Sequence, residues 1–385
     1  MGADHSGPLS GLRVLAVGTD WRTGPRAVHA LRRAGCHVIS ADRAGAGFLH
    51  GRSMRSLRVR RHPDPELAPE QMASWVETQA RALRVDAVVP VSEDATRVCA
   101  MQNLDLGSAR LAGPTHDQFH ALCDKGMLGV TAARVGVSHP ETRIVDTVEE
   151  CAGMTFPVIV KSSEGIGVDS LPAGVGRVDT QDELDVVAGE IIASGAHVVV
   201  QEFITGEQWS AHIVRDGEKW AGLSAIITHR SPRGAGTPTI LRVTPREDVW
   251  LQAVKLLAEV DYRGGANVQF IDRDGELFVH DVNLRSPATV IMPIRAGLDV
   301  PAMGLAAALG LPWQAPEAFE PVTYLWLESE LKEAARARSV RDLMSTLAMI
   351  PQRNVVLDPN PLDPWYIARF GARVVRAVRK RLPGT

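Results

Sequence analysis

Four polar side chains surround a predicted hairpin of two strands. They are Gln269, Asp281, Asn283 and Arg285. The strand bodies are apolar, and the run 272–276 between them contains the Asp-Gly pair that is typical of a hairpin turn. Because side chains alternate along a strand, the last three residues should share one face. Oxygen ligands suit Mg²⁺ and arginine binds phosphate oxygens, so the pattern predicts a magnesium–phosphate site. The alternative is a polar rim in which Asp281 is a turn residue.

Two of the six lysines in the chain, Lys161 and Lys125, stand at a strand end and at a helix start. Lys161 follows the apolar strand 158–160 and precedes Gly165 and Gly167. A lysine at a strand end provides a point charge, and the glycines leave backbone N–H groups available to phosphate oxygens. Lys125 stands just before a predicted helix, where the alternative is a solvated lysine at a helix start.

The elements that must position these residues begin with a β–α–β pattern, which predicts a parallel sheet with covered faces. Strands are expected at 12–17, 37–42 and 86–91, and a helix at 25–34. Ligands of open parallel sheets gather at the carboxyl ends of the strands. The segments Gly18–Arg22 and Ser92–Asp94 are therefore candidate substrate loops, with ordinary loop chemistry as the alternative.

Composition excludes several classes of protein. The chain has 385 residues, 45% hydrophobic and 23% charged, with a net charge of −3, so it suits two or three domains and gives no global reason to expect nucleic acid. No run is long enough for a transmembrane helix, and no secretory signal is visible. The four cysteines form no metal-binding or redox spacing and are expected as free thiols in the cytoplasm.

Four segments, in order, resemble the ATP-grasp superfamily and in particular its carbamoyl-phosphate-synthetase-like branch. Residues 124–140 are similar to the family pattern "DK…GIPxP", residues 156–167 to "PxxVKPxxGxG", residues 200–207 to "xxEExixGxE", and the set at 269–285 to the metal-binding strands. Together they extend from about Asp124 to Pro301. The final motif differs from the usual Glu-x-Asn-Pro-Arg, because Asp281 replaces the glutamate and Leu284 the proline.

The resemblance implies a role for each matched residue. Lys125, Lys161, Gly165 and Gly167 would bind the phosphates of ATP. Glu202 would lie beside adenine, the backbone of Phe203 and Ile204 would contact its edge, and Glu207 would bind the ribose. Gln269, Asp281 and Asn283 would hold Mg²⁺, with Mn²⁺ as the alternative ion. The short reach of Asp281 makes a second ion less expected. Arg285 would neutralise the transferring phosphoryl group. Arg230 and Arg233 would hold the substrate carboxylate or acylphosphate, unless their loop is simply solvated.

The implied fold class is α/β: an ATP-grasp fold, with two α+β lobes around ATP, preceded by a Rossmann-like parallel domain. The expected domains are 1–115, 116–312 and a C-terminal helical segment 313–385. The ATP-grasp part would divide into a small lobe at about 125–205 and a metal-binding lobe at about 206–312. A basic amphipathic helix at 365–382 should dock on its own domain or on a dimer partner, with a membrane surface as the alternative.

The implied activity is that of a stand-alone ligase that activates a carboxylate as an acylphosphate and couples it to an amine, releasing ADP and phosphate. Its partners would be small-molecule acids and amines rather than nucleic acid or membrane, and the family habit suggests a homodimer. The alternatives are a kinase or carboxylase on the same fold, and a regulatory protein that binds ATP without turnover.

Overall fold

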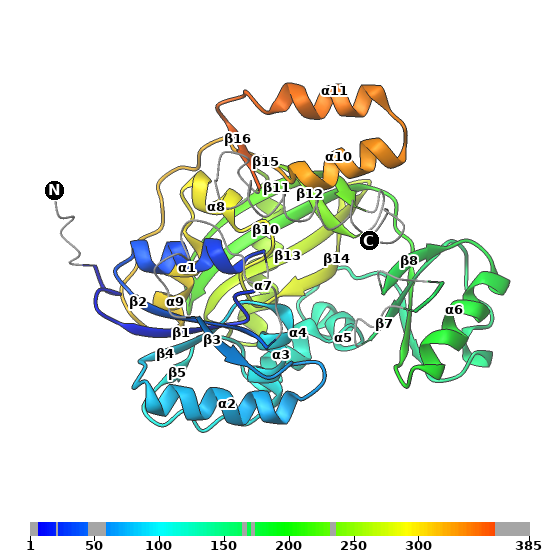
Figure 1. Ribbon diagram of the computed structural model, residues 1–385. Helices are drawn as coiled ribbons and strands as arrows, with labels where there is room; N and C mark the ends of the chain where they lie inside the picture. Colours follow the sequence, from blue (N-terminus) through cyan, green and yellow to red (C-terminus); the bar gives the residue numbers. More distant parts are fainter. Residues whose placement is uncertain are drawn as a thin grey trace, which may run out of the picture.

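Three β-sheets organise the chain (Figure 1). The computed structural model describes residues 7–20, 22–44, 59–163, 168–170, 174–231 and 236–358. All statements about the structure concern these residues.

The first sheet is parallel and contains five strands in the order β3-β2-β1-β4-β5. The strands are β1 (Arg13–Val17), β2 (His37–Arg43), β3 (Val59–His62), β4 (Ala87–Pro90) and β5 (Arg110–Leu111). They alternate with α1 (Gly24–Arg33), α2 (Pro69–Ala82) and α3 (Glu93–Met101). The central strand β1 is apolar and buried on both faces. This arrangement confirms the predicted Rossmann-like beginning of an α/β fold.

The second sheet is smaller, antiparallel, and ordered β6-β9-β7-β8. Its strands are β6 (Thr142–Val145), β7 (Val158–Ser162), β8 (Val175–Val178) and β9 (Val198–Glu202). Helix α6 (Gln181–Ala193) and the 3₁₀ helix η2 (Glu149–Cys151) pack on it around a valine-rich core. Figure 1 shows this unit set apart on the right, joined to the first sheet through α4 (His116–Cys123) and α5 (Met127–Arg134).

The third sheet has seven strands, ordered β14-β13-β10-β11-β12-β15-β16. Its first five strands in this order are antiparallel, with bounds β10 (Glu207–Asp216), β11 (Lys219–Ser231), β12 (Thr237–Val243), β13 (Gly264–Arg273) and β14 (Glu276–Asn283). Helix α7 (Glu247–Glu259) covers one face, while α8 (Ile291–Ala296) and α9 (Val300–Ala308) pack in the core on the other. The rest of that second face is left to line a cavity.

The part after residue 312 corrects the expectation of a purely helical segment. Helices α10 (Leu327–Arg336) and α11 (Val340–Met349) are present as expected. However, β15 (Thr323–Leu325) and β16 (Val355–Leu357) extend the large sheet. Three-residue strands are too short to show an alternating pattern. Tyr324, the middle residue of β15, is nevertheless fully buried in the core. The predicted helix at 365–382 lies outside the described residues.

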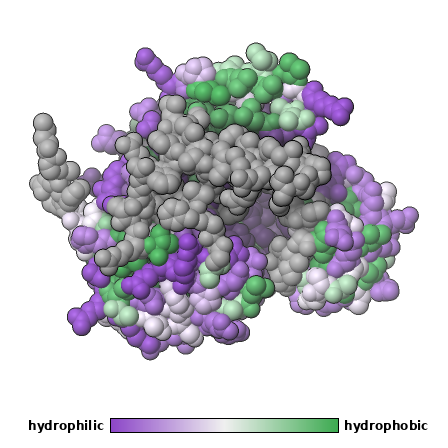
Figure 2. Space-filling model, in the orientation of Figure 1, coloured by the Kyte–Doolittle hydropathy of each residue, from purple (hydrophilic) through white to green (hydrophobic). Residues whose placement is uncertain are grey.

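Helix α11 presents an apolar stripe to the outside (Figure 2). Val340, Leu343, Met344 and Leu347 are all exposed, at the spacing of one helical face. Within the described chain, no helix has the length and apolar character needed to cross a membrane. The cysteines at 36, 99, 123 and 151 are free thiols, as expected.

Candidate active site

A cavity of about 930 Å³ is lined by residues from all three sheets. Most of the residues predicted from the sequence line it: Lys125, Lys161, Glu202, Phe203, Ile204, Arg230, Gln269, Asp281, Asn283 and Arg285. Gly165, Gly167 and Arg233 lie outside the described residues. Side chains that are up to 160 positions apart in the chain therefore share one polar space, as an active site requires.

Asp281 is the centre of the polar network in this cavity. Its Oδ1 accepts a hydrogen bond from Lys125 Nζ at 2.5 Å. Its Oδ2 accepts from Asn283 Nδ2 at 2.6 Å and from Gln269 Nε2 at 3.2 Å. Burial alone would raise the pKa of the Asp281 carboxyl, but Lys125, His280 and Lys161 outweigh that and hold the pKa well below its usual range. The carboxylate is therefore ionised throughout the physiological pH range.

A β-bulge turns Asp281 toward the cavity. Phe270 pairs with Val279 and Gln269 pairs with Asp281, so His280 is an extra residue in β14. Before the bulge, Leu277 and Val279 point into the core. Without it, Asp281 would follow the same alternation and also enter the core. The sequence contains a signal that our strand prediction missed, since the buried apolar residues change from odd positions to even ones at Val282 and Leu284.

Lys161 lies at the opposite side of the same space, near the end of β7. Its Nζ donates to Gln201 Oε1 at 2.8 Å. Burial, together with the nearby Lys125 ammonium, lowers the pKa of Lys161 from 10.5 to about 7. A bound polyanion would favour the charged form and raise this pKa again.

Nucleotide binding should therefore take up a proton at Lys161. At about pH 8 the side chain is mostly neutral in the free protein and becomes charged beside the phosphates, so affinity for ATP should fall as the pH rises above about 7. Calorimetry at about pH 8 in two buffers of different ionisation heat measures the uptake. The Lys161→Met variant should lose most of it, and a binding heat that is the same in both buffers would contradict the assignment.

Arg230 is a second cation that reaches the β13–β14 hairpin. It lies within β11 rather than in a loop as expected, because β11 continues to Ser231. Its guanidinium donates to Gln269 Oε1 at 2.7 Å, to the Gly236 carbonyl at 2.6 Å and to Gln208 Oε1. Burial lowers the pKa of Arg230 to about 10, which still leaves it charged at neutral pH. The Arg230 side chain is thus a positive charge that hydrogen bonds hold in place in the lining of the cavity.

The segment between β9 and β10 forms one edge of the cavity. Glu202 accepts from Arg273 at 2.7 Å, and the Arg177 guanidinium lies 4.7 Å from the centre of the Phe203 ring. Ile204 is buried. Gly206 is required here, because a Cβ at this position would lie 1.8 Å from the Asp272 carbonyl oxygen. A close backbone crossing therefore fixes the path of this segment.

Glu207 corrects one of the residue predictions. It is exposed at the start of β10 and is not among the residues that line the cavity. Alternation along the strand turns Glu207 and the core residue Trp209 to one side, and turns Gln208 and Ser210 toward the cavity. The family pattern has a residue between its glycine and its glutamate, and this spacing also selects Gln208. Gln208, rather than Glu207, is therefore the side chain of this pair that lines the cavity.

The oxygen donors around Asp281 suit one Mg²⁺ ion. Gln269 and Asn283 each carry an amide oxygen. Their amide nitrogens donate to Asp281 and the Gln269 oxygen accepts from Arg230, so a flip of the Asn283 amide would turn its oxygen beside the Asp281 carboxylate. Mg²⁺ is commonly held by one or two carboxylates together with substrate phosphates. Among the described residues, no group of three or more His, Cys, Asp and Glu side chains could hold a metal. A phosphate-bound ion therefore fits this set better than an all-protein metal centre.

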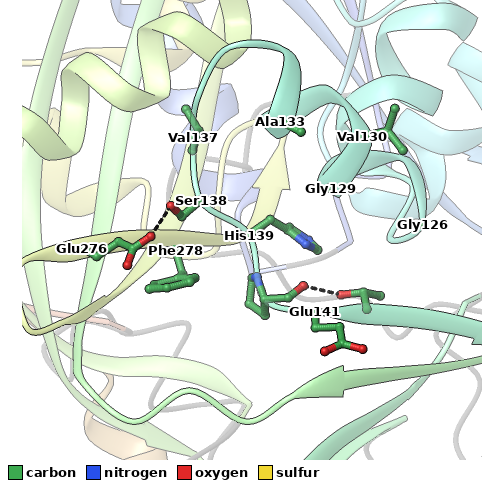
Figure 3. A pocket seen from close by; sticks show the side chains of 12 residues that line it. Gly126, Gly129, Val130, Ala133, Val137, Ser138, His139, Glu141, Glu276 and Phe278 are labelled. Atoms are coloured by element: carbon green, nitrogen blue, oxygen red, sulfur yellow. Dashed lines mark hydrogen bonds between the residues drawn. The ribbon is translucent and has the colours of Figure 1, made fainter.

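A second cavity, of about 530 Å³, is lined by α5, by residues 137–142 and by Glu276 and Phe278 of β14, and it shares Pro140 with the lining of the first (Figure 3). Ser138 Oγ donates to Glu276 Oε1 at 2.5 Å across its rim. Figure 3 shows the His139 ring directed toward Gly129 of α5. Burial, with Lys161 and Lys125 nearby, lowers the pKa of His139 to about 4, so the ring is neutral. None of the residues predicted for the site lines this space.

A polar cavity between two lobes, in which Lys125 contacts Asp281 of the hairpin and Lys161 lies on the smaller sheet, defines the class of protein. Residues 131–289 match the family model for an ATP-grasp domain, and the chain therefore carries an ATP-grasp domain.

Individual proteins with similar sequences or structures describe the resemblance more closely. Over 192 residues the chain is 25% identical to the carbamoyl phosphate synthase large chain of Clostridium beijerinckii. This match covers 46% of the chain and only 18% of that relative. Among solved structures, the ADP complex of N5-carboxyaminoimidazole ribonucleotide synthetase has a TM-score of 0.66 and 14% identity, covering 86% of this chain and 85% of that one. The L-amino acid ligase of Bacillus licheniformis has a TM-score of 0.64 and 15% identity, covering 81% and 79%. The predicted fold and its branch are confirmed by these similarities.

The sequence analysis underestimated the contribution of the first sheet. Residues at and just beyond the ends of its strands line the cavity, including Asp20, Arg43, His62 and Glu66. Both candidate loops contribute, through Asp20 from one and Ser92, Glu93 and Asp94 from the other. Glu93 Oε2 accepts from Arg285 at 2.8 Å, so this side of the cavity is joined directly to the hairpin.

Proposed function

We propose that this protein is an ATP-dependent ligase that activates a small-molecule carboxylate as an acylphosphate and couples it to an amine. The observation that carries the proposal is the meeting of Lys125, Lys161, Arg230 and Arg285 around Asp281 in one cavity. Arg285 is paired with Glu93, and the other three cations share one carboxylate, Asp281, so this part of the cavity has a surplus of positive charge that suits a triphosphate and a second anionic substrate.

Phosphoryl transfer needs alignment and charge neutralisation more than covalent help from the protein. Lys161 and Lys125 would bind the phosphate oxygens, and Arg285 would neutralise the transferring group. Asp281, Gln269 and Asn283 would hold Mg²⁺, which supplies further charge neutralisation when bound. Arg230 is close enough to this set to orient the substrate carboxylate for attack on the terminal phosphorus.

The ligase is favoured over the alternatives by the extent of the cavity. Beyond the predicted nucleotide-binding residues, it continues to a polar side formed by the first sheet, which provides room for an acid and an amine. The similarity to an L-amino acid ligase also supports amide formation. A kinase or carboxylase on the same fold, and an ATP-binding regulator, are outcomes of the test below. A cytoplasmic location and a homodimer stay predictions of the sequence.

The activity is tested by ADP release with pools of carboxylic acids and amino acids, with mass-spectrometric detection of a coupled product. We expect ADP and phosphate, with release that depends on both an acid and an amine. Heavy oxygen in the substrate carboxylate should appear in the phosphate, because that oxygen leaves with the phosphoryl group. Label in AMP would overturn the acylphosphate route. Release without an amine would indicate a kinase, and tight ATP binding without turnover would indicate a regulator.

A further inference from the structure

Carboxylates are concentrated on the side of the cavity that the first sheet provides. We call this set the acidic wall: Asp20, Glu66, Glu93 and Asp94. Among the described residues of that side, Arg43 is the cation that lines the cavity, and its nitrogens lie 3.7 Å from Asp20 and 3.8 Å from Glu66. Arg43 also contacts Asp64 at 3.5 Å. One guanidinium is thus shared by several acids, and the wall keeps a surplus of negative charge.

Asp94 shows that surplus most clearly. It stands in the first turn of α3, and its partner is Arg97 on the same helix, at 3.4 Å. Burial and the nearby Glu66 raise the pKa of the Asp94 carboxyl above its ordinary value. A carboxylate in this situation is stabilised by an additional cation.

His62 provides an independent sign that a donor is missing. Its side chain is buried, with 1% exposure of the residue, and it lines the cavity beside the acidic wall. Nδ1 lies 2.7 Å from the Pro63 carbonyl oxygen, which can only accept, so Nδ1 carries the hydrogen. Burial lowers the pKa of His62, and the neutral ring keeps a lone pair on Nε2. This buried Nε2 has no hydrogen-bond partner in the structure. Buried polar atoms are rarely left without one.

We propose that the acidic wall and His62 form the subsite for the amine substrate, which binds as a primary ammonium group. The inference rests on the proposed ligase function and names the class of its second substrate. An ammonium group offers three donors and no acceptor, which complements a set made of carboxylates and one imidazole lone pair. A divalent metal fits less well, since no described group of three or more His, Cys, Asp and Glu side chains could hold one.

The position of the wall suits the reaction. Glu93 belongs to the wall and is paired with Arg285, which lies just after the metal-binding hairpin. An amine held by Asp94 and Glu66 would therefore lie beside the end of the cavity where the acylphosphate forms. The ammonium group would first give a proton to one of these carboxylates; its neutral nitrogen would then attack the acyl carbon, and phosphate would leave as the C–N bond forms. Holding the two reactants in neighbouring subsites is the main source of rate in such a coupling.

The test compares a charged nucleophile with an uncharged one. The full chain is assayed with ATP and the acid identified by the ADP-release screen, using proteinogenic amino acids as amine probes and hydroxylamine as a nucleophile that is largely uncharged at neutral pH. Asp94→Asn and Glu66→Gln should raise the KM for the amino acid roughly tenfold or more. The ratio of amide to hydroxamate should fall by a similar factor. Asp117→Asn is the matched control, because Asp117 is fully exposed in the first turn of α4.

The outcomes separate the two proposals. An unchanged ratio in both acidic-wall variants overturns the ammonium subsite while leaving the ligase function intact. Wild-type protein that forms neither hydroxamate nor amide overturns the ligase function, and the subsite with it. Thermal unfolding of each variant identifies a folding defect. Should Asp94→Asn unfold, Glu66→Gln still decides, because Glu66 is an exposed side chain.

Discussion

Replacing Asp281 by Asn is expected to lower the rate of ADP release by roughly a hundredfold or more. The change removes the carboxylate that pairs with Lys125 and receives hydrogen bonds from Asn283 and Gln269. It also removes the charged member of the predicted Mg²⁺ ligands. Loss of one group that stabilises charge in the transition state costs on the order of a hundredfold in rate. The steady-state rate, measured at saturating ATP and Mg²⁺, reports the effect.

Asp274→Asn is the matched control for this prediction. Asp274 lies in the turn of the same hairpin, is exposed, and has a positive φ of 55°, a conformation that asparagine adopts readily. Its rate should stay within about twofold of wild type, since surface changes of this kind have small effects. Wild-type turnover in the Asp281 variant, or full activity in the presence of EDTA, would show that the metal assignment is wrong.

Lys161→Ala should weaken ATP binding by roughly tenfold or more. Charge-assisted hydrogen bonds contribute roughly 1.5–3 kcal/mol, and 1.4 kcal/mol corresponds to about tenfold in affinity. The lysine is partly buried at the edge of the cavity with Gln201 as its hydrogen-bond partner, so a phosphate would replace a neutral acceptor with a charged one. Titration calorimetry measures the change directly.

Glu207→Ala provides the comparison for Lys161→Ala. Because Glu207 points away from the cavity, its removal should leave the ATP affinity within about twofold, whereas Gln208→Ala should weaken it. An unchanged affinity in the Lys161 variant would remove that residue from the nucleotide site. A large loss in the Glu207 variant would restore the original assignment and argue against Gln208.

The fold could be predicted from sequence where its signals are local. The first sheet follows from apolar strands that alternate with helices, and the β13–β14 hairpin follows from its Asp-Gly turn. Strand β15 could not be predicted in this way. It has three residues and is stabilised by tertiary burial, above all of Tyr324.

The residues of the candidate site also fall into two groups, those that a local sequence signal predicts and those that it does not. Lys161 belongs to a motif in which the end of a strand places the residue, so the sequence pattern alone brings it to the cavity. Asp281 was expected in the hairpin, but the bulge that turns it toward the cavity was not predicted. The acidic wall joins Asp20, Glu66 and Asp94 from three separate strand ends, and no sequence spacing connects them. Only the rule that ligands gather at the carboxyl edge of a parallel sheet indicated this region. Glu207 does not line the cavity, because one residue of register decides which side of a strand a side chain faces.

The bulge at His280 has a consequence for how this protein can change over evolutionary time. A single deletion there would exchange the two faces of the strand beyond it, directing Asp281 and Asn283 into the apolar interior and Val282 toward the cavity. No single substitution could reverse that exchange. Lineages that keep the activity should therefore tolerate many different residues at position 280 before they tolerate a gap. The length of this strand is a stricter requirement than the identity of the residue that bulges from it.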